Sequence, residues 1–155
     1  MEIEYSYIYK DLKKKVLPPG EWIDEADEAF FDYKDIKCSV VRFFPEGKIG
    51  TLNGYCIIPK GHPWRNKKGI FDFENIDVHG GISYFSRDKI GFDASHGFDD
   101  IPSMMFIREK IFEDMKERGP WNELISQIFS SKYRNMEYMI EECKKLADAI
   151  ILTSK

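Results

Sequence analysis

The sequence lacks the features that mark several large protein classes. Its first residues, Met1 to Glu4, show neither the basic start nor the apolar core of a secretory signal. No stretch approaches the roughly 20 apolar residues that span a bilayer. It contains no P-loop, no Gly-x-Ser-x-Gly elbow and no His-Glu-x-x-His signature. We therefore expect a cytoplasmic protein outside the most recognisable classes of nucleotide hydrolase, serine hydrolase and metalloprotease.

Cysteine is scarce. The chain has three cysteines, Cys38, Cys56 and Cys143, which form no Cys-x-x-Cys pair and lie among apolar neighbours. An odd number without a framework of spacings favours free thiols in a reducing compartment over disulfides. The sequence thus predicts three buried, unpaired cysteines.

Positive charge is also limited. The net charge is −4 and the pI is about 5.5. The two dense basic runs, at residues 13–15 and 65–68, are short and typical of solvated loops. A protein that wraps a nucleic-acid duplex usually has a basic face, so we do not expect a duplex as partner. An acidic protein can instead bind a basic partner surface.

What is present is ample core material. The 155 residues are 43% hydrophobic and 15% aromatic, enough for one domain with one core. Pro18-Pro19-Gly20 interrupts the chain. We expect an N-terminal strand or arm over residues 1–19 and a single domain over residues 20–155.

The hydrophobic pattern predicts strands early in the domain and helices late in it. Apolar residues at helical spacing indicate a short helix within residues 21–33, and aromatic and β-branched residues indicate strands. The predicted strands cover residues 2–9, 37–44, 51–58, 76–85 and 89–95. Strands followed by helices favour an α+β fold, an antiparallel sheet with helices packed on one face.

The C-terminal third is expected to be helical. Met104, Ile107, Ile111 and Met115 recur at helical spacing, and residues 121–129 suggest a further helical turn. A longer apolar stripe defines a C-terminal amphipathic helix capped by Ser130 or Ser131. The stripe consists of Tyr133, Met136, Met139, Ile140, Cys143, Leu146, Ala147 and Ile150.

All three histidines, His62, His79 and His96, lie beside glycine or proline in the middle third. Histidine is the side chain whose unperturbed pKa is nearest neutrality, so it suits acid–base work or ligand contact. A single histidine is more often structural, and the argument for function rests on the cluster between Asp77 and Asp100.

A hairpin with Ser86-Arg87-Asp88 as its loop would pair Phe85 with Lys89 and place His79 opposite Ser95. Asp93 is then a diagonal neighbour of His79 and can orient its imidazole. His96 has the wrong parity for this face and joins only if the chain bends after Asp93. The structural alternative is a buried hydrogen bond between His79 and Asp93 that satisfies the polar atoms of both side chains and has no further function.

Other groups of the predicted site are Asp77, Gly80, Gly81, Tyr84 and His62. Adjacent glycines weaken a strand, which is explained by a bulge or by close approach of a ligand or another backbone. The histidine spacings fit no compact metal signature, so we predict neither a metal nor a cofactor.

Several of these motifs together resemble an uncharacterised family of small phage, prophage and bacterial proteins. The family reads "GYV-x-x-P-x-x-HP", "VHGGLTY" and "GFDCAH-x-D", then a C-terminal helix with "EC-x-x-LA". The corresponding segments here are residues 54–63, 78–84, 91–99 and 142–147, and the resemblance spans about residues 20–147. Ala94 replaces the family's cysteine, which argues against a functional thiol there. Residues 101–129 look like a lengthened insert.

The resemblance implies a phage-type accessory protein, with an anti-defence role by association and host cytoplasm as its location. Our first hypothesis is that the hairpin binds, or binds and hydrolyses, a small phosphorylated or nucleotide-like ligand. His79 would be the acid–base group, Asp93 its orienter, and His96 and Tyr84 auxiliary contacts. The alternative is a non-enzymatic inhibitor that covers a basic host protein with acidic residues, namely Asp24, Glu25, Asp27 and Glu28. A nuclease is a third reading with no metal motif behind it.

Overall fold

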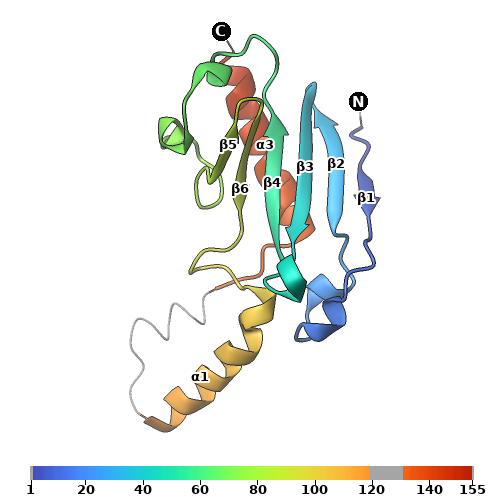
Figure 1. Cartoon of the computed structure of the whole chain (residues 1–155), viewed down its shortest axis with the longest axis vertical. Coiled ribbons are helices and arrows are strands. Elements are labelled where there is room, and N and C mark those ends of the chain that lie inside the picture. Colours follow the sequence, from blue (N-terminus) through green and yellow to red (C-terminus); the bar gives the residue numbers. More distant parts are fainter. Residues whose placement is uncertain (1, 119–130, 155) are drawn as a thin grey trace.

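Six strands form one antiparallel sheet in the computed structural model, which describes residues 2–118 and 131–154. The strand order is β1-β2-β3-β4-β6-β5, so β1 and β5 are the two edges (Figure 1). The strands are β1 (Ser6–Ile8), β2 (Glu28–Tyr33), β3 (Ile36–Phe43), β4 (Thr51–Ile57), β5 (Tyr84–Ser86) and β6 (Lys89–Asp93). Helix α1 (Met105–Arg118) and helix α3 (Met136–Leu152) follow, which confirms the α+β fold class.

Helix α3 covers the middle of the sheet. It packs against β4, β3 and β2, and it lies behind these strands in Figure 1. The apolar stripe read from the sequence is buried from Met136 to Ile150. Alternate residues of β3 meet it, with Cys38 and Val40 buried. The predicted strands 37–44 and 51–58 are confirmed within a residue at each end.

The N-cap of α3 is Asn135, and not the predicted serines. Its side-chain oxygen accepts a hydrogen bond from the backbone N–H of Tyr138 at 2.9 Å, as an N-cap should. Ser131 lies four residues before this cap, and Ser130 lies outside the described residues. Tyr133, the first residue of the predicted stripe, precedes the helix.

The helix predicted within residues 21–33 is wrong. The structure has one short turn of 3-10 helix, Glu21–Ile23, and then strand β2. In β2 the inward residues are Ala29 and Phe31, and Ala29 lies opposite Val40 of β3. Residues two apart point to the same face of a strand, so both can reach the core from β2. The stabilisation from pairing with β3 outweighs the helical preference that the local pattern indicates.

The predicted hairpin is also shorter and shifted. Residues 76–83 form no strand, and Ser86 pairs with Lys89, so the turn contains only Arg87 and Asp88. The expected pairing of Phe85 with Lys89 is therefore off by one residue, because a two-residue loop replaces the three-residue loop. A one-residue shift moves every side chain to the other face of the sheet.

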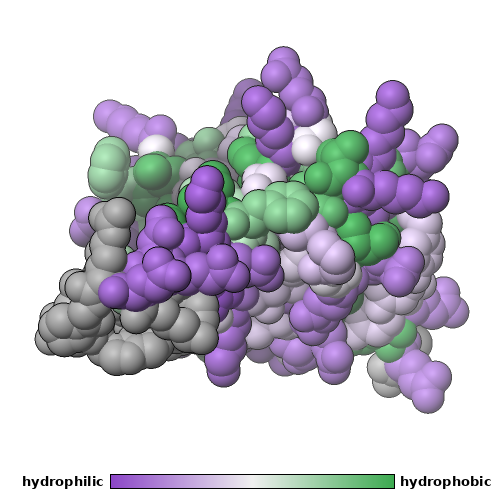
Figure 2. Space-filling model, turned by 90° about the horizontal axis from the view of Figure 1, so that it is seen from below, coloured by the Kyte–Doolittle hydropathy of each residue, from purple (hydrophilic) through white to green (hydrophobic). Residues whose placement is uncertain are grey.

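Helix α1 is confirmed, but it does not lie on the sheet. It projects beyond the sheet's end (Figure 1), and its apolar residues Ile107 and Ile111 are 54% and 39% exposed, as is Met104 just before the helix at 49%. Seen from below, the molecule shows hydrophobic residues among hydrophilic ones (Figure 2). The helical turn predicted for residues 121–129 lies outside the described residues.

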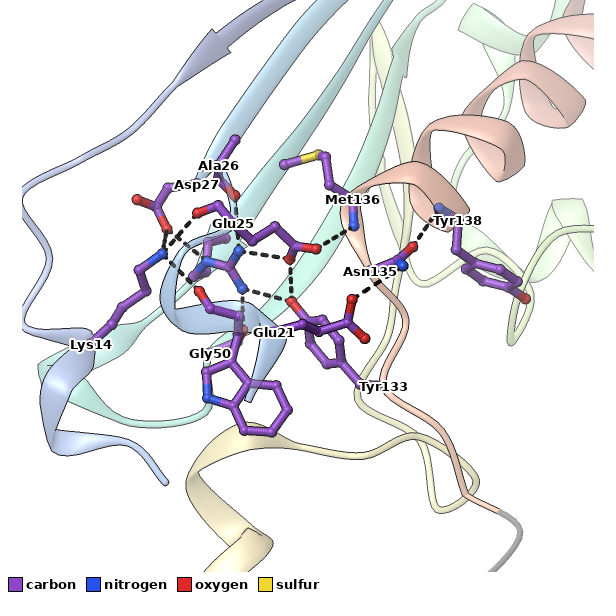
Figure 3. A network of polar contacts seen from close by, with 12 residues as sticks. Lys14, Glu21, Glu25, Ala26, Asp27, Gly50, Tyr133, Asn135, Met136 and Tyr138 are labelled. Carbon is purple, nitrogen blue, oxygen red and sulfur yellow. Dashed lines mark hydrogen bonds and ion pairs between the residues drawn. The ribbon is translucent and has the colours of Figure 1, made fainter. Parts of the chain in front are cut away.

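A buried network of charges joins the N-terminal segment, β3 and the start of α3 (Figure 3). Its centre is Arg42 of β3, whose side chain is fully buried. The guanidinium donates to the carboxylates of Asp27 at 2.8 Å and Glu25 at 3.0 Å, and to the hydroxyl of Tyr133 at 2.9 Å. Lys14 adds a second cation 2.9 Å from Asp27.

Glu25 links this network to α3. Its second carboxylate oxygen accepts the backbone N–H of Met136 at 3.0 Å, the first residue of the helix (Figure 3). Two cations and two carboxylates thus balance each other in the interior. The acidic residues of the inhibitor hypothesis are consequently used within the fold, since Asp27 is buried, Glu25 is mostly buried and Glu28 pairs with Lys10. Only Asp24 of the four is exposed.

The three cysteines are buried and unpaired, as predicted. The sulfur atoms of Cys38 and Cys56 lie 3.6 Å apart, on directly opposite residues of β3 and β4. Hydrogen bonds to the neighbouring thiols and burial raise the pKa of Cys56 well above its usual value. Within the described ranges, no helix is long and apolar enough to cross a membrane.

Candidate functional site

Two loops bring His79, His96 and Asp99 together beside β6. His79 belongs to the loop before β5, and the other two residues follow β6, which ends at Asp93. One nitrogen of each imidazole and a carboxylate oxygen of Asp99 all lie within 4.8 Å of one another. The bend after Asp93 that His96 required is therefore present. We call these three residues the His–Asp cluster.

Asp99 is the hub of the cluster. Its side chain is fully buried and accepts hydrogen bonds from His79 Nε2 at 2.7 Å, His96 Nδ1 at 3.0 Å and Arg134 Nε at 2.9 Å. The backbone N–H of His96 donates a further bond at 3.0 Å. Burial by itself raises the pKa of Asp99, but these hydrogen bonds outweigh it and lower the pKa to about 2. Asp99 is thus ionised at neutral pH.

An ionised Asp99 fixes the tautomer of each imidazole in its neutral form, because a carboxylate only accepts hydrogen bonds. His79 carries its proton on Nε2, and its Nδ1 accepts from the hydroxyl of Tyr138 at 2.8 Å. Both nitrogens of His79 are therefore occupied, and its side chain is only 4% exposed. His96 carries its proton on Nδ1, so Nε2 has a free lone pair. Among described residues nothing hydrogen-bonds this Nε2, and the side chain is 26% exposed.

Gly80 lets the backbone pass close to the ring of His96, where a side chain would collide with it. A Cβ atom built on Gly80 would lie 2.1 Å from Cε1 and 2.3 Å from Nε2 of His96. Gly80 also has a φ of 68°, in the left-handed region that favours glycine. The close approach that the paired glycines suggested is real, but it is made to the imidazole of His96. Gly81 shares the left-handed conformation without any such contact.

Three further residues support the cluster. The guanidinium of Arg134 lies over the rings of Phe98 at 6.0 Å and Tyr138 at 5.1 Å, in cation–π geometry. Phe98 stacks on His96 with ring centroids 5.1 Å apart and planes within 3°. The hydroxyl of Tyr138, on the first turn of α3, anchors His79. The imidazoles are therefore held in place on several sides.

A groove of about 250 Å³ opens beside the cluster, between the loop after β6 and helix α1. His96 and Asp99 lie at one wall, and Met105, Ile107 and Ile111 form an apolar wall. Arg108 also lines it and donates to Asp100 at 2.8 Å. This volume lies slightly below the usual range for small-molecule sites.

The cluster's donors, two imidazoles and one carboxylate, are also a set that holds metal ions. In the present arrangement the two imidazole protons occupy the space between the three groups. Metal binding would require both histidines to release those protons and change tautomer. The chemistry that the geometry favours directly is proton transfer at His96 Nε2.

The predicted orienting partner Asp93 is not bonded to His79. Its carboxylate accepts the backbone N–H of Ser95 at 3.0 Å and lies 3.8 Å from Nδ1 of His96. The prediction fails because residues 76–83 leave the sheet, so no strand register connects His79 to Asp93. The orienting carboxylate is Asp99.

His62 lies elsewhere in the structure. Its Nδ1 accepts the backbone N–H of Trp64 at 3.0 Å, and its Nε2 donates to the carbonyl of Ile150 at 2.7 Å. Ile150 and the site residue Tyr138 are separated by about 18 Å along α3, at a rise of 1.5 Å per residue. His62 therefore ties a loop to the far end of α3 and does not join the cluster.

Two other predicted residues are also outside the cluster. The side chain of Asp77 is 97% exposed, with Lys145 at 3.8 Å. The ring of Tyr84, on β5, packs edge-on against Tyr55 at 5.5 Å. Of the predicted site, the structure brings together His79, Gly80 and His96, with Asp93 at the margin.

Sequence reasoning missed Asp99, Arg134 and Tyr138. Asp99 has a local signal, since it follows His96 by three residues across Gly97 and its N–H bonds the His96 carbonyl at 2.9 Å, as in a turn. Arg134 and Tyr138 lie more than 30 residues later, and no local pattern links them to a histidine.

Comparisons with known proteins find no matching family model, no similar curated protein and no similar solved structure. The resemblance to small phage and bacterial proteins therefore stays a prediction.

Proposed function

We propose that the chain binds a small phosphorylated or nucleotide-like ligand in the groove beside the His–Asp cluster and hydrolyses it. The observation that carries the proposal is the Asp99–His96 pair: a buried, ionised carboxylate behind an imidazole whose other nitrogen is open. This arrangement is that of an oriented general base. The acid–base role moves from His79, whose nitrogens are both occupied, to His96.

The groove supports the choice of ligand class. Its apolar wall of Met105, Ile107 and Ile111 suits a flat organic group such as a nucleobase. Arg108 offers a guanidinium, a group that pairs well with phosphate oxygens. The resemblance to phage proteins would place this activity in an accessory or anti-defence role.

The chemical step follows from the tautomer. His96 Nε2 accepts a proton from a water molecule as the water oxygen bonds to phosphorus. The bond from phosphorus to the leaving oxygen breaks, and the imidazolium returns its proton to that oxygen. Asp99 stabilises the imidazolium without taking its proton, and Arg134 holds Asp99 in place.

Binding and turnover can be tested separately. Adenosine 5′-monophosphate is the binding probe, followed by isothermal titration calorimetry in every variant and through the NMR resonance of the His96 Cε1 proton in the proteins that keep His96. Bis(p-nitrophenyl) phosphate is the hydrolysis probe. We expect Arg108→Gln to weaken binding at least tenfold. His96→Gln should abolish hydrolysis while changing binding by less than about threefold, since only the base is lost.

Arg87→Gln is the matched control, because it makes the same change in charge at the exposed hairpin turn. It should leave binding and hydrolysis unchanged. The proposal is wrong if neither the nucleotide nor inorganic phosphate at millimolar concentration perturbs His96. Binding that Arg108→Gln leaves intact would remove the assigned groove.

The alternative of an acidic inhibitor loses three of the four residues on which it relied, and only Asp24 stays exposed. Glu25 and Asp27 are engaged with Arg42, and Glu28 with Lys10, so they form no free acidic surface.

A further inference from the structure

A second groove, of about 530 Å³, lies between edge strand β1 and the first turns of α3, and it is separate from the His–Asp cluster. Three tyrosines of the N-terminal segment line one side: Tyr5, Tyr7 and Tyr9. They alternate along the chain, so they lie on one face of the strand. Glu137 and Glu141 of α3 line the other side. Aromatic rings opposite carboxylates are the lining that recognises organic cations.

Two residues of this lining, Tyr5 and Glu141, already contact an ammonium group of the chain itself. The Nζ atom of Lys144 lies 5.5 Å from the ring centre of Tyr5 and 2.8 Å from a carboxylate oxygen of Glu141. A ring face and a carboxylate thus share a single ammonium at one end of the groove. The contacts of Lys144 show how a tyrosine ring and a glutamate of this lining bind an ammonium group together.

None of the described residues that line the groove is basic. Tyr7 and Tyr9 are 48% and 68% exposed, and no basic side chain in the described ranges pairs with Glu137. Burial, the neighbouring tyrosines and Glu137 raise the pKa of Tyr7, and the ammonium of Lys144 opposes them, so the charges of Glu137 and Lys144 both lie near that ring. The position formed by Tyr7, Tyr9 and Glu137 therefore resembles the one filled by Lys144.

The strand beside the groove is open on its outer side. β1 is the terminal strand of the sheet, and across the described part of the chain it pairs only with β2. An exposed edge strand can accept a further strand from another protein. Alternate residues of an added strand repeat every 6.6 Å or so, which is also the spacing of the tyrosines.

We propose that this groove binds lysine side chains carried at alternate positions of an extended segment of a partner protein. The ammonium groups would lie on the faces of Tyr7 and Tyr9 beside Glu137, and the backbone would pair with β1. The proposal does not depend on the function assigned to the His–Asp cluster.

The test uses the full chain and a fluorescein-labelled octapeptide of alternating lysine and threonine, with binding followed by fluorescence anisotropy. We expect Tyr7→Ala and Glu137→Gln each to weaken binding five- to tenfold, and Tyr7→Phe to retain it, since the ring persists. Glu74→Gln, an exposed loop substitution with the same change of charge, is the matched control and should have no effect. Circular dichroism should show unchanged helix content in every variant.

Two results would overturn the proposal. One is equal peptide affinity for the wild-type chain and for a Tyr7→Ala, Glu137→Gln double variant that keeps its helix content. The other is equal affinity for free spermidine and for the peptide, which would show that the groove selects a cation without an extended backbone. A peptide with glutamate in place of lysine should not bind.

Discussion

At the residue scale, the cluster depends on the protonation state of one carboxylate. Asp99 accepts four hydrogen bonds, and its ionisation decides which nitrogen of His96 is left open. A partly buried histidine in a loop has no defined tautomer unless a hydrogen-bond partner fixes the proton on one ring nitrogen. The buried aspartate supplies that definition, which is why His96 and not His79 is suited to proton transfer.

The glycine pair gives a prediction at this scale, because Gly80 and Gly81 have similar left-handed φ values of 68° and 79°. Only Gly80 has the His96 ring where a Cβ would lie. Gly81→Ala should therefore lower the free energy of unfolding by about 1 kcal/mol, for the backbone conformation alone. Gly80→Ala should lower the free energy of unfolding by about 1–3 kcal/mol more than Gly81→Ala, because the ring of His96 must move.

Urea denaturation measures both losses, and the His96 Cε1 proton resonance reports the ring. It should shift in Gly80→Ala and stay in place in Gly81→Ala. Equal losses with an unmoved resonance would contradict the close packing of Gly80 on His96.

At the element scale, the charge network around Arg42 positions α3 relative to the sheet. Glu25, which precedes β2, accepts one hydrogen bond from Arg42 of β3. It accepts another from the backbone of Met136 at the start of α3 (Figure 3). The same first turn of α3 carries Tyr138, which anchors His79. The network is thus connected to the candidate site through the helix it holds.

Replacing Arg42 tests this link. Arg42→Met should lower the free energy of unfolding by about 3–5 kcal/mol, because two buried carboxylates lose their main cation. Arg42→Lys should recover only part of the loss, since an ammonium cannot make the forked contacts. Lys34→Met is the control: Lys34 pairs with Asp148 at the surface, and such pairs contribute about 1 kcal/mol or less.

Guanidinium or urea titration gives these values. Stability of Arg42→Met equal to that of Lys34→Met would show that the network does not hold α3 to the sheet.

At the scale of the whole molecule, two buried aspartates make stability depend on acid pH. Burial by itself raises the pKa of Asp27, but hydrogen bonds from Lys14 and Arg42 outweigh it and lower the pKa below 3.8. The pKa of Asp99 falls from 3.8 to about 2. A lowered pKa in the folded state stabilises the fold above the unfolded value, and this stabilisation is lost as the pH falls through the folded value.

We expect the free energy of unfolding to fall between about pH 4 and pH 2, with Asp99 responsible for about 2 kcal/mol of the fall. Asp99→Asn removes the ionisable group, so its stability should be lower at pH 7 but should fall by about that much less on acidification. Chemical denaturation at successive pH values measures both curves. Parallel curves for the two proteins would show that the Asp99 pKa is not lowered by folding.

The sequence by itself determined the α+β class, strands β3 and β4, the α3 stripe and the unpaired cysteines, because these follow from local periodicity and composition. It also located the region of the candidate site, through His79, Gly80 and His96. Tertiary structure decided the rest. β2 became a strand through pairing with β3, and α1 left its apolar stripe exposed. His79 bonds to Asp99 and not to Asp93, because residues 76–83 lie outside the sheet, with Gly80 and Gly81 in the left-handed region. A hydrogen bond between distant segments depends on where the chain turns, and a one-residue change in a turn redirects every side chain beyond it.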